Sequence, residues 1–176
     1  MGANPTHIGV ITEPRRKHVV TLVPAASFAS GDVISAALHT LDCAALAVGM
    51  GMKVVGIKVW EKSPEGTQIK PSLRFHFYNV AITTLPALNA PFTIHNDDYL
   101  KHVGHHDVVT GDYVEFSDGS DADPDHAKLI KTIDPNLSPT LYTATVTNTL
   151  WMAVEIRETK DLTNTTLTIE LDTLKV

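Results

Sequence analysis

The sequence predicts an all-β protein: a two-sheet antiparallel β-sandwich, jelly-roll-like, with an extended N-terminal arm and one or two short helical turns. Short runs of alternating apolar and polar residues recur along the 176 residues, and turn-forming residues separate them. Charged residues make up only 19% of the chain, and Thr, Ser, Asn and His supply much of its polarity. Because surface helices depend on Glu, Lys and Arg, this composition favours strands.

The chain is expected to divide into an arm, residues 1–17, and one sandwich domain, residues 18–176. Prolines interrupt regular structure in the arm, and its last residues are basic. These cations are either solvated or in contact with an acidic surface of a partner. The candidate partner-contact residues are Arg15, Arg16, Lys17 and Trp151.

Several segments have the period-two pattern of strands. The predicted strands are residues 18–23, 53–61, 73–82, 107–116, 141–147, 150–158 and 165–176. In the second of them one apolar face consists of Val55, Ile57 and Val59. In the third, the apolar face consists of Leu73, Phe75 and Phe77. The tryptophans in these strands, Trp60 and Trp151, could stack on sugars or serve in packing.

Residues 101–109, KHVGHHDVV, contain three histidines within five positions. We expect a helical turn from Asp97 to Val103, ended by Gly104, and a strand from His105 onward. The zincin pattern H-E-x-x-H is absent because Val103 stands where the glutamate would be. The histidines are therefore expected to be structural, mostly at the surface or an interface, where they would make assembly sensitive to pH.

Other catalytic or metal-binding patterns are incomplete. Asp121, Asp123 and Asp125 have the spacing of an EF-hand loop, but His126 and Thr132 occupy its diagnostic Gly and Glu positions. The sequence contains neither a G-x-S-x-G elbow nor a glycine-rich phosphate loop after a strand. We therefore expect no enzymatic activity, no catalytic residues, no metal and no cofactor.

Charge and hydropathy limit the partners. The net charge is −6 with neutral histidines and no basic stripe is present, so nucleic acid is not an expected ligand. His39 and Asp42 interrupt the most apolar stretch, so no membrane span is expected. Cys43 is the only cysteine, which excludes an intramolecular disulfide and indicates a reducing compartment.

The order of segments resembles a family of small structural proteins of tailed bacteriophages and prophages, encoded beside the major capsid protein. The resemblance covers roughly residues 19–60, 73–108 and 149–175. The segments that carry it are ASFASGDVIS, GMKVVGIKVWEKS, LRFHFYN, FTIHNDDYLKHVGHHDV, LWMAVEIRET and TLTIELDTLKV. The longer arm, the acidic SDGSDADPD loop and the histidines depart from the family pattern.

The resemblance implies a virion structural role, most directly that of a capsid decoration (cement) protein. Such a protein would bind the major capsid protein at the capsid surface as a homotrimer, after assembly in the host cytoplasm. The alternatives are a β-module associated with a tail, neck or fibre, and a carbohydrate-binding adhesion module. A metal-dependent enzyme would require the histidines to converge with Asp107 or Asp112.

Overall fold

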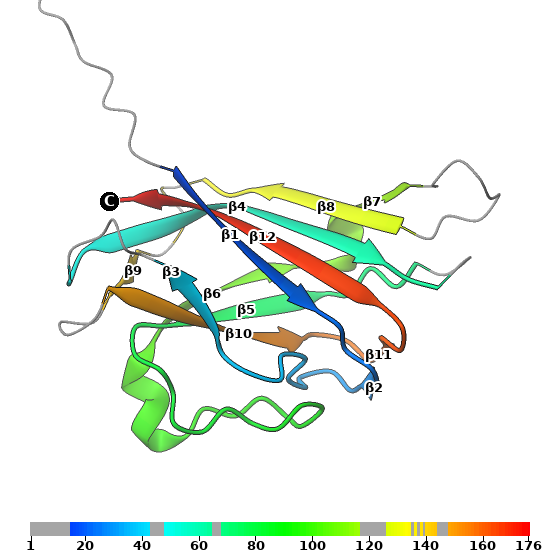
Figure 1. Cartoon of the computed structure of the whole chain (residues 1–176), viewed down its shortest axis with the longest axis horizontal. Helices are drawn as coiled ribbons and strands as arrows, with labels where there is room; N and C mark the ends of the chain where they lie inside the picture. Colours follow the sequence, from blue (N-terminus) through cyan, green and yellow to red (C-terminus); the bar gives the residue numbers. More distant parts are fainter. Residues whose placement is uncertain are drawn as a thin grey trace, which may run out of the picture.

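A computed structural model describes residues 15–42, 48–64, 68–116, 126–134, 136, 138, 140–143 and 148–176 (Figure 1). Strands dominate it, with two 3₁₀ turns, η1 and η2. The elements are β1 (Arg15–Leu22), β2 (Ser27–Phe28), β3 (His39–Asp42), β4 (Gly51–Lys62), β5 (Leu73–Tyr78), η1 (Asn96–Lys101), β6 (His102–Val108), η2 (Thr110–Asp112), β7 (Tyr113–Phe116), β8 (His126–Thr132), β9 (Leu141–Tyr142), β10 (Thr149–Ile156), β11 (Lys160–Asp161) and β12 (Thr166–Lys175).

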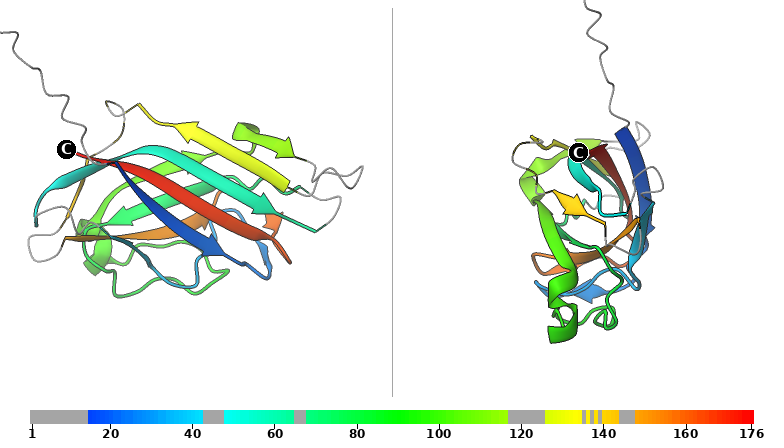
Figure 2. Two further views of the ribbon diagram at one scale, coloured as in Figure 1. Left: turned by 45° about the horizontal axis from the view of Figure 1, so that its top comes forward. Right: turned by 90° about the vertical axis from the view of Figure 1, so that its left-hand side faces the viewer.

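The strands form two main antiparallel sheets, which lie face to face (Figure 2). The first sheet has the order β1-β12-β4-β8-β7, and β9 also pairs with β4. The second sheet has the order β3-β10-β5-β6, and β11 and β2 form a small separate ribbon. The predicted all-β sandwich is confirmed, although this strand order could not be read from the sequence.

The main core lies between the two sheets and follows the predicted alternation. Leu167, Ile169 and Leu171 of β12 are buried there together with Phe75 and Phe77 of β5. Within each strand these residues are two positions apart, so in each strand they project from the same face, which points into the core. This cluster draws side chains from most strands of both sheets, so the sandwich closes around a single apolar centre.

The long strand β4 contains an irregularity that the simple alternation misses. The register with β12 shifts between Asp172 and Thr173, so that Thr173 pairs with Val54. As a result Val54 joins Ile57 and Val59 in the main core cluster. The prediction that Val55 shares their face is therefore wrong, because a bulge inserts one residue and reverses the side-chain direction beyond it.

The predicted helical turn exists, but it is shorter than expected. η1 ends at Lys101 and β6 already begins at His102. Gly104 lies inside β6, where its φ of 155° accompanies a register shift opposite Phe77 and Tyr78. The prediction that Gly104 ends the helix is thus wrong: this glycine supplies a conformation that other residues rarely adopt at an irregularity of the sheet.

Other boundaries also differ from the prediction. β1 begins at Arg15, so the three basic residues belong to a strand rather than to the arm. The strand expected over 107–116 is divided by η2. Of the strand expected over 141–147, β9 forms Leu141–Tyr142, and residues 144–147 lie outside the described residues. Strands β2, β3, β8 and β11 were not predicted. Residues 1–14, Cys43 and the acidic loop 117–125 lie outside the described residues.

Residues 79–101, here called the cover segment, cross the outer face of the second sheet (Figure 1). Beneath it a second, smaller apolar cluster forms around Tyr78, Ile82 and Ala153, with Phe92 and Trp151 partly buried against it. The backbone N–H of Phe92 donates to the carbonyl of Gly31, and that of Val33 donates to the carbonyl of Ala90. These hydrogen bonds fasten the cover segment to the loop between β2 and β3. The second sheet is therefore covered on both faces.

No helix among the described residues is long and apolar enough to cross a membrane.

Candidate functional site

The most concentrated group of titratable side chains lies on the outer face of the second sheet, partly beneath the cover segment. It consists of His76 on β5, His102 and His105 on β6, and Glu155 on β10, and we call it the histidine cluster. Cross-strand register explains the gathering, because His76 pairs with His105 on one side and with Ala153 on the other. Residues paired across neighbouring strands point to the same face of a sheet, and Glu155 is two positions from Ala153. The side chains of His76, His105 and Glu155 therefore share one face.

His76 is the centre of the histidine cluster and is almost fully buried. Its Nε2 lies 2.7 Å from Oε2 of Glu155, and its Nδ1 lies 3.3 Å from Nε2 of His102. The ring stacks on Phe92 of the cover segment, with 3.9 Å between the ring centroids. Since a carboxylate only accepts, Nε2 of neutral His76 carries the hydrogen. Its Nδ1 then accepts a hydrogen bond from His102.

Burial determines the charge state of these histidines. Desolvation lowers the pKa of His76, although its hydrogen bond to Glu155 acts in the opposite direction. Desolvation, reinforced by the neighbouring His76 and His105, lowers the pKa of His102 to about 4. Both rings are thus neutral at pH 7. A neutral imidazole has one ring nitrogen with a lone pair, which can accept a proton or bind a metal ion.

Two ion pairs flank the histidine cluster and balance its charge. Arg74 reaches both carboxylate oxygens of Asp107, with distances of 2.7 and 2.8 Å from Nε and Nη2. Arg157 donates from Nη1 to Oε1 of Glu155. Burial opposes ionisation of Glu155, yet the hydrogen bonds from His76 and Arg157 lower its pKa overall. This carboxyl group therefore remains an anion that can orient His76.

The arrangement resembles part of a general-base site, in which a carboxylate orients a histidine. However, Glu155 and His102 already engage both ring nitrogens of His76, so His76 has no free nitrogen with which to accept a substrate proton. Among the described residues, no group of three or more His, Cys, Asp or Glu side chains converges closely enough to hold a metal ion as it stands.

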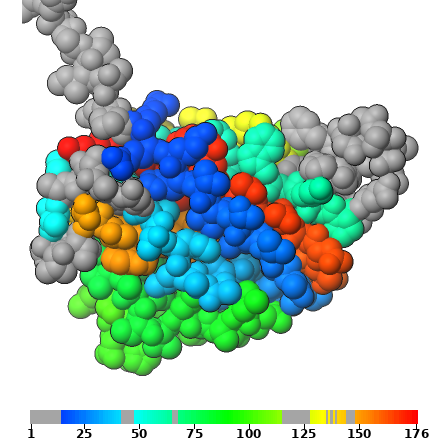
Figure 3. Space-filling view, viewed as in Figure 1, coloured from blue at the N-terminus to red at the C-terminus, as the bar shows by residue number. Residues whose placement is uncertain are grey.

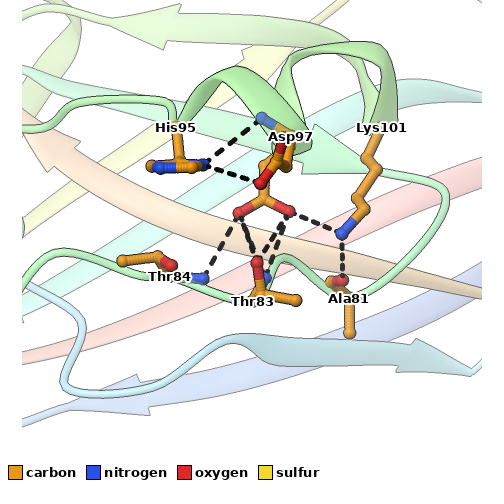
Figure 4. A network of polar contacts seen from close by, with 7 residues as sticks. Ala81, Thr83, Thr84, His95, Asp97 and Lys101 are labelled. Atoms are coloured by element: carbon orange, nitrogen blue, oxygen red, sulfur yellow. Dashed lines mark hydrogen bonds and ion pairs between the residues drawn. The ribbon is translucent and has the colours of Figure 1, made fainter.

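A second polar network fixes the cover segment beside the histidine cluster (Figure 4). The carboxylate of Asp98, in η1, is completely buried. It accepts hydrogen bonds from the backbone N–H and hydroxyl of Thr83, from the N–H of Thr84 and from Nζ of Lys101. Lys101, followed by the threonine N–H groups, lowers the pKa of Asp98 to about 2. One side chain thus joins the two ends of the cover segment.

Asp98→Ala is expected to loosen the cover segment while the sandwich remains folded. The substitution removes the acceptor shared by Thr83 and Thr84, which lie at the surface and lose the hydrogen bonds that hold them to η1. Amide hydrogen exchange should therefore accelerate at least about tenfold at these two residues and little in the core strands, since local opening precedes global unfolding. Asp97→Ala, at an exposed neighbouring carboxylate, is the control. Equal exchange rates in both variants would contradict the assigned role.

His106 lies on the opposite face of β6 from His105, as predicted for consecutive residues of a strand. Its Nε2 lies 3.1 Å from Oγ of Ser138, and its ring meets the edge of Phe77. Burial is the main cause that lowers the pKa of His106 to about 4. His106 is therefore a structural, partly buried histidine, as the sequence led us to expect.

An apolar hollow of about 210 Å³ lies away from the histidine cluster, at the end of β1. Leu22, Val23, Ile34 and Leu88 contribute to its lining, and His39 is the only titratable residue among the lining side chains. Nε2 of His39 is buried without a hydrogen-bond partner among the described residues, and desolvation lowers the pKa of this imidazole. A single histidine in apolar surroundings does not provide an acid–base pair.

The structure separates the four candidate partner-contact residues. Arg15, Arg16 and Lys17 lie together at the start of β1, where Nζ of Lys17 is 3.0 Å from Oε2 of Glu170. Trp151 is on the other sheet, half-buried against the apolar cluster under the cover segment. Arg15 and Lys17 project from the outer face of β1, Arg16 from the opposite face, and the tryptophan belongs to another part of the molecule.

Sequence reasoning did not identify Glu155 or His76 as members of a site. Alternation does place Arg74 and His76 on one face of β5, and Glu155 and Arg157 on one face of their own segment. What the sequence does not reveal is that β5 and β10 are adjacent. Only this pairing brings His76 to Glu155, 79 positions away along the chain.

Comparison with known proteins yields no family. No protein-family model matches the sequence, and no curated protein matches it. Among solved structures, a chain of desmodium yellow mottle tymovirus is 13% identical, with 99% of this chain and 94% of that chain covered and a TM-score of 0.28. A chain of the cyanophage Pam1 capsid asymmetric unit is 11% identical, with coverages of 99% and 92% and a TM-score of 0.28.

A chain of cocksfoot mottle virus is 9% identical, with 99% of this chain and 89% of that chain covered and a TM-score of 0.30. These neighbours come from viruses, and one is a phage capsid. Because a TM-score below 0.5 does not establish a shared fold, these similarities carry no weight in assigning a function to this chain.

Proposed function

We propose that this chain is a non-enzymatic structural protein of a tailed-phage virion. In the form that we favour, it is a decoration protein that binds the outer capsid surface and stabilises contacts between capsid subunits. The order of segments that resembles small phage structural proteins supports this proposal. So does the histidine cluster, in which the central imidazole is enclosed by other side chains rather than open to a substrate.

The observation that carries the proposal is the surface formed by β1. This strand is at the end of its sheet and, within the described residues, pairs only with β12. It runs across the molecular surface as the blue band in Figure 3. Val19 on β1 and Val23 just beyond it are 57% and 67% exposed. An eight-residue edge strand with exposed valines is a surface that proteins usually cover.

The two ends of β1 differ in charge, so a partner segment could bind in only one orientation. The N-terminal end of β1 is basic, with Arg15 and Arg16, whereas its C-terminal half carries the exposed Val19. An acidic, extended segment of a capsid subunit could add to the outer edge of β1 and place its carboxylates beside the arginines. Main-chain hydrogen bonds would then supply affinity, and the charges would fix the register.

The remaining parts of the proposal follow from this role. The partner would be the major capsid protein, the location would be the capsid surface, and assembly would take place in the host cytoplasm. We also propose that the protein forms a homo-oligomer, most simply a trimer. An oligomer could bridge neighbouring capsid subunits, which is the role that the family resemblance implies. Neither nucleic acid nor a membrane is needed as a partner.

The alternative adhesion function would need an aromatic platform on an open sheet face. Trp60 is 44% exposed on the first sheet, but Nζ of Lys128 lies 3.6 Å from the centroid of its ring. The other tryptophan, Trp151, is half-buried under the cover segment. Neither tryptophan therefore offers an open ring face, which favours the capsid proposal over sugar stacking on these residues.

Replacing Arg15, Arg16 and Lys17 with Ser is expected to weaken binding to undecorated capsids about ten- to hundred-fold. Exposed charges contribute up to about 1 kcal/mol each at an interface and act mainly on association. The effect should be largest at low salt and shrink as salt screens the charges. Binding is measured by co-sedimentation with capsids over a range of protein concentrations.

The matched control removes the same charge from other strands, through Lys62→Ser, Lys128→Ser and Lys160→Ser together. This triple variant should keep an affinity within about threefold of the unmodified protein, since only general attraction is lost. Equal weakening in both triple variants would mean that net charge, rather than the β1 surface, governs binding.

A further inference from the structure

The histidine cluster contains two ring nitrogens whose separation suits a metal ion. Nδ1 of His76 faces Nε2 of His102 across 3.3 Å. Zinc–nitrogen bonds are about 2.0 to 2.1 Å long and the usual geometry is tetrahedral, which places two ligand nitrogens about 3.3 to 3.4 Å apart. A cation could replace the hydrogen between the two rings if His102 carries its hydrogen on Nδ1 instead of Nε2 and both rings tilt so that their lone pairs point at the ion.

The surroundings of His76 have the features of an outer shell around a metal ligand. A ligating histidine commonly donates its other N–H to a carboxylate, which fixes the tautomer and makes the lone pair more basic. Glu155 does this for His76 at 2.7 Å, and Arg157 in turn holds Glu155. Phe92 stacks on the imidazole and excludes water from that side.

A third imidazole is within reach. His105 is the cross-strand partner of His76, and its side chain is exposed. Its ring centroid lies 6.1 Å from that of His76 and 6.3 Å from that of His102. The three rings do not yet converge on one point, so His105 would have to turn about its side-chain bonds. Three imidazoles and one water would complete a tetrahedral site.

We propose that His76, His102 and His105 bind a divalent transition-metal cation on the outer face of β5 and β6. Imidazole ligands suit zinc, copper and nickel better than calcium or magnesium, and zinc is the simplest probe. The proposal revises the expectation of no metal that the sequence suggested. It goes beyond capsid decoration and does not depend on it. A bound ion would join β5 to β6 and stabilise the stacking of His76 on the cover segment.

The test is calorimetric titration of Zn²⁺ into the full-length protein after treatment with a chelator, at pH 7.5. One equivalent is expected to bind saturably, with a rise in melting temperature that excess chelator reverses. His76→Gln and His102→Gln should each weaken binding at least about a hundred-fold, because each removes a direct ligand. Glu155→Gln should weaken it about ten- to hundred-fold, as removal of an outer-shell partner does.

Two further variants guard against misfolding and adventitious binding. His105→Gln changes an exposed side chain, so it should leave folding intact and still weaken binding about tenfold or more. His95→Gln, at a half-exposed histidine outside the cluster, should leave the affinity unchanged. The proposal is overturned if no saturable zinc binding appears up to about 1 mM, or if His105→Gln and His95→Gln have the same effect.

Discussion

Phe75→Ala is expected to lower the free energy of unfolding by about 3 to 5 kcal/mol, the usual cost of truncating a buried phenylalanine. The Phe75 side chain is completely buried in the main core, and Val154 of β10 lies opposite it in the second sheet. Alanine would leave a cavity between the two sheets that the paired strands cannot close. Since domains of this kind are stable by only about 5 to 15 kcal/mol, the loss is severe.

Urea denaturation followed by tryptophan fluorescence measures this change. Val114→Ala, at a side chain that is 61% exposed on β7, should change the same free energy by less than about 0.5 kcal/mol. If Phe75→Ala does not fold, Phe75→Leu preserves more of the volume and should cost less than about 1.5 kcal/mol. Similar values for Phe75→Ala and Val114→Ala would contradict the core described above.

Acidification from pH 7 to pH 4.5 is expected to lower the free energy of unfolding by about 3 to 5 kcal/mol through His102 and His106 together. Burial is the main cause that lowers the pKa of each to about 4, whereas an unfolded histidine titrates near 6.5. Between these values the unfolded chain binds more protons. Stability is therefore constant above about pH 6.5 and falls as the pH drops toward 4.

Most charged neighbours act in the same direction, although Asp107 opposes the lowering of the pKa of His106. His76, His105 and Arg74 oppose a positive charge on His102. Denaturation should be measured with a chelator present, so that metal binding does not contribute. His106→Gln should remove about half of the pH dependence. A flat stability profile from pH 7 to 4.5 would contradict the burial of these rings.

Local periodicity was sufficient to predict the sandwich, but not its irregularities. Alternation correctly assigned Phe75 and Phe77 to the core, because every second side chain of a half-buried strand points inward. It failed at Val55, and the expectation that Gly104 ends a helical turn was also wrong; at both places the strand register shifts at a bulge. A bulge depends on how the partner strand is aligned, and a short pattern within one strand does not contain that alignment.

The histidine cluster was only partly visible in the sequence. The run from His102 to His106 indicated a histidine-rich segment at β6. The residue that contacts both His102 and the carboxylate, however, is His76, on another strand. Its carboxylate partner, Glu155, comes from a third strand, 79 positions further along. Sequence spacing predicts which side chains share a face of one strand, whereas a site across three strands depends on the order of strands in the sheet.

The same reasoning applies to the β1 surface. The basic run of Arg15, Arg16 and Lys17 is evident in the sequence, but its position at a sheet edge is not. An identical run on a central strand would have neighbours on both sides. Here the order of strands places β1 at the end of the first sheet, so that among the described residues it pairs with β12 alone, and its Val19 is exposed.

The central claim, that the chain decorates a phage capsid, is tested most directly by adding the purified protein to undecorated capsids. Electron cryomicroscopy of the mixture should show it at symmetry-related positions on the outer surface, with a fixed number of copies per capsid subunit. Heating should then disrupt the decorated particles at a higher temperature than the bare ones. Capsids that remain bare at saturating protein, with an unchanged disruption temperature, would contradict the claim.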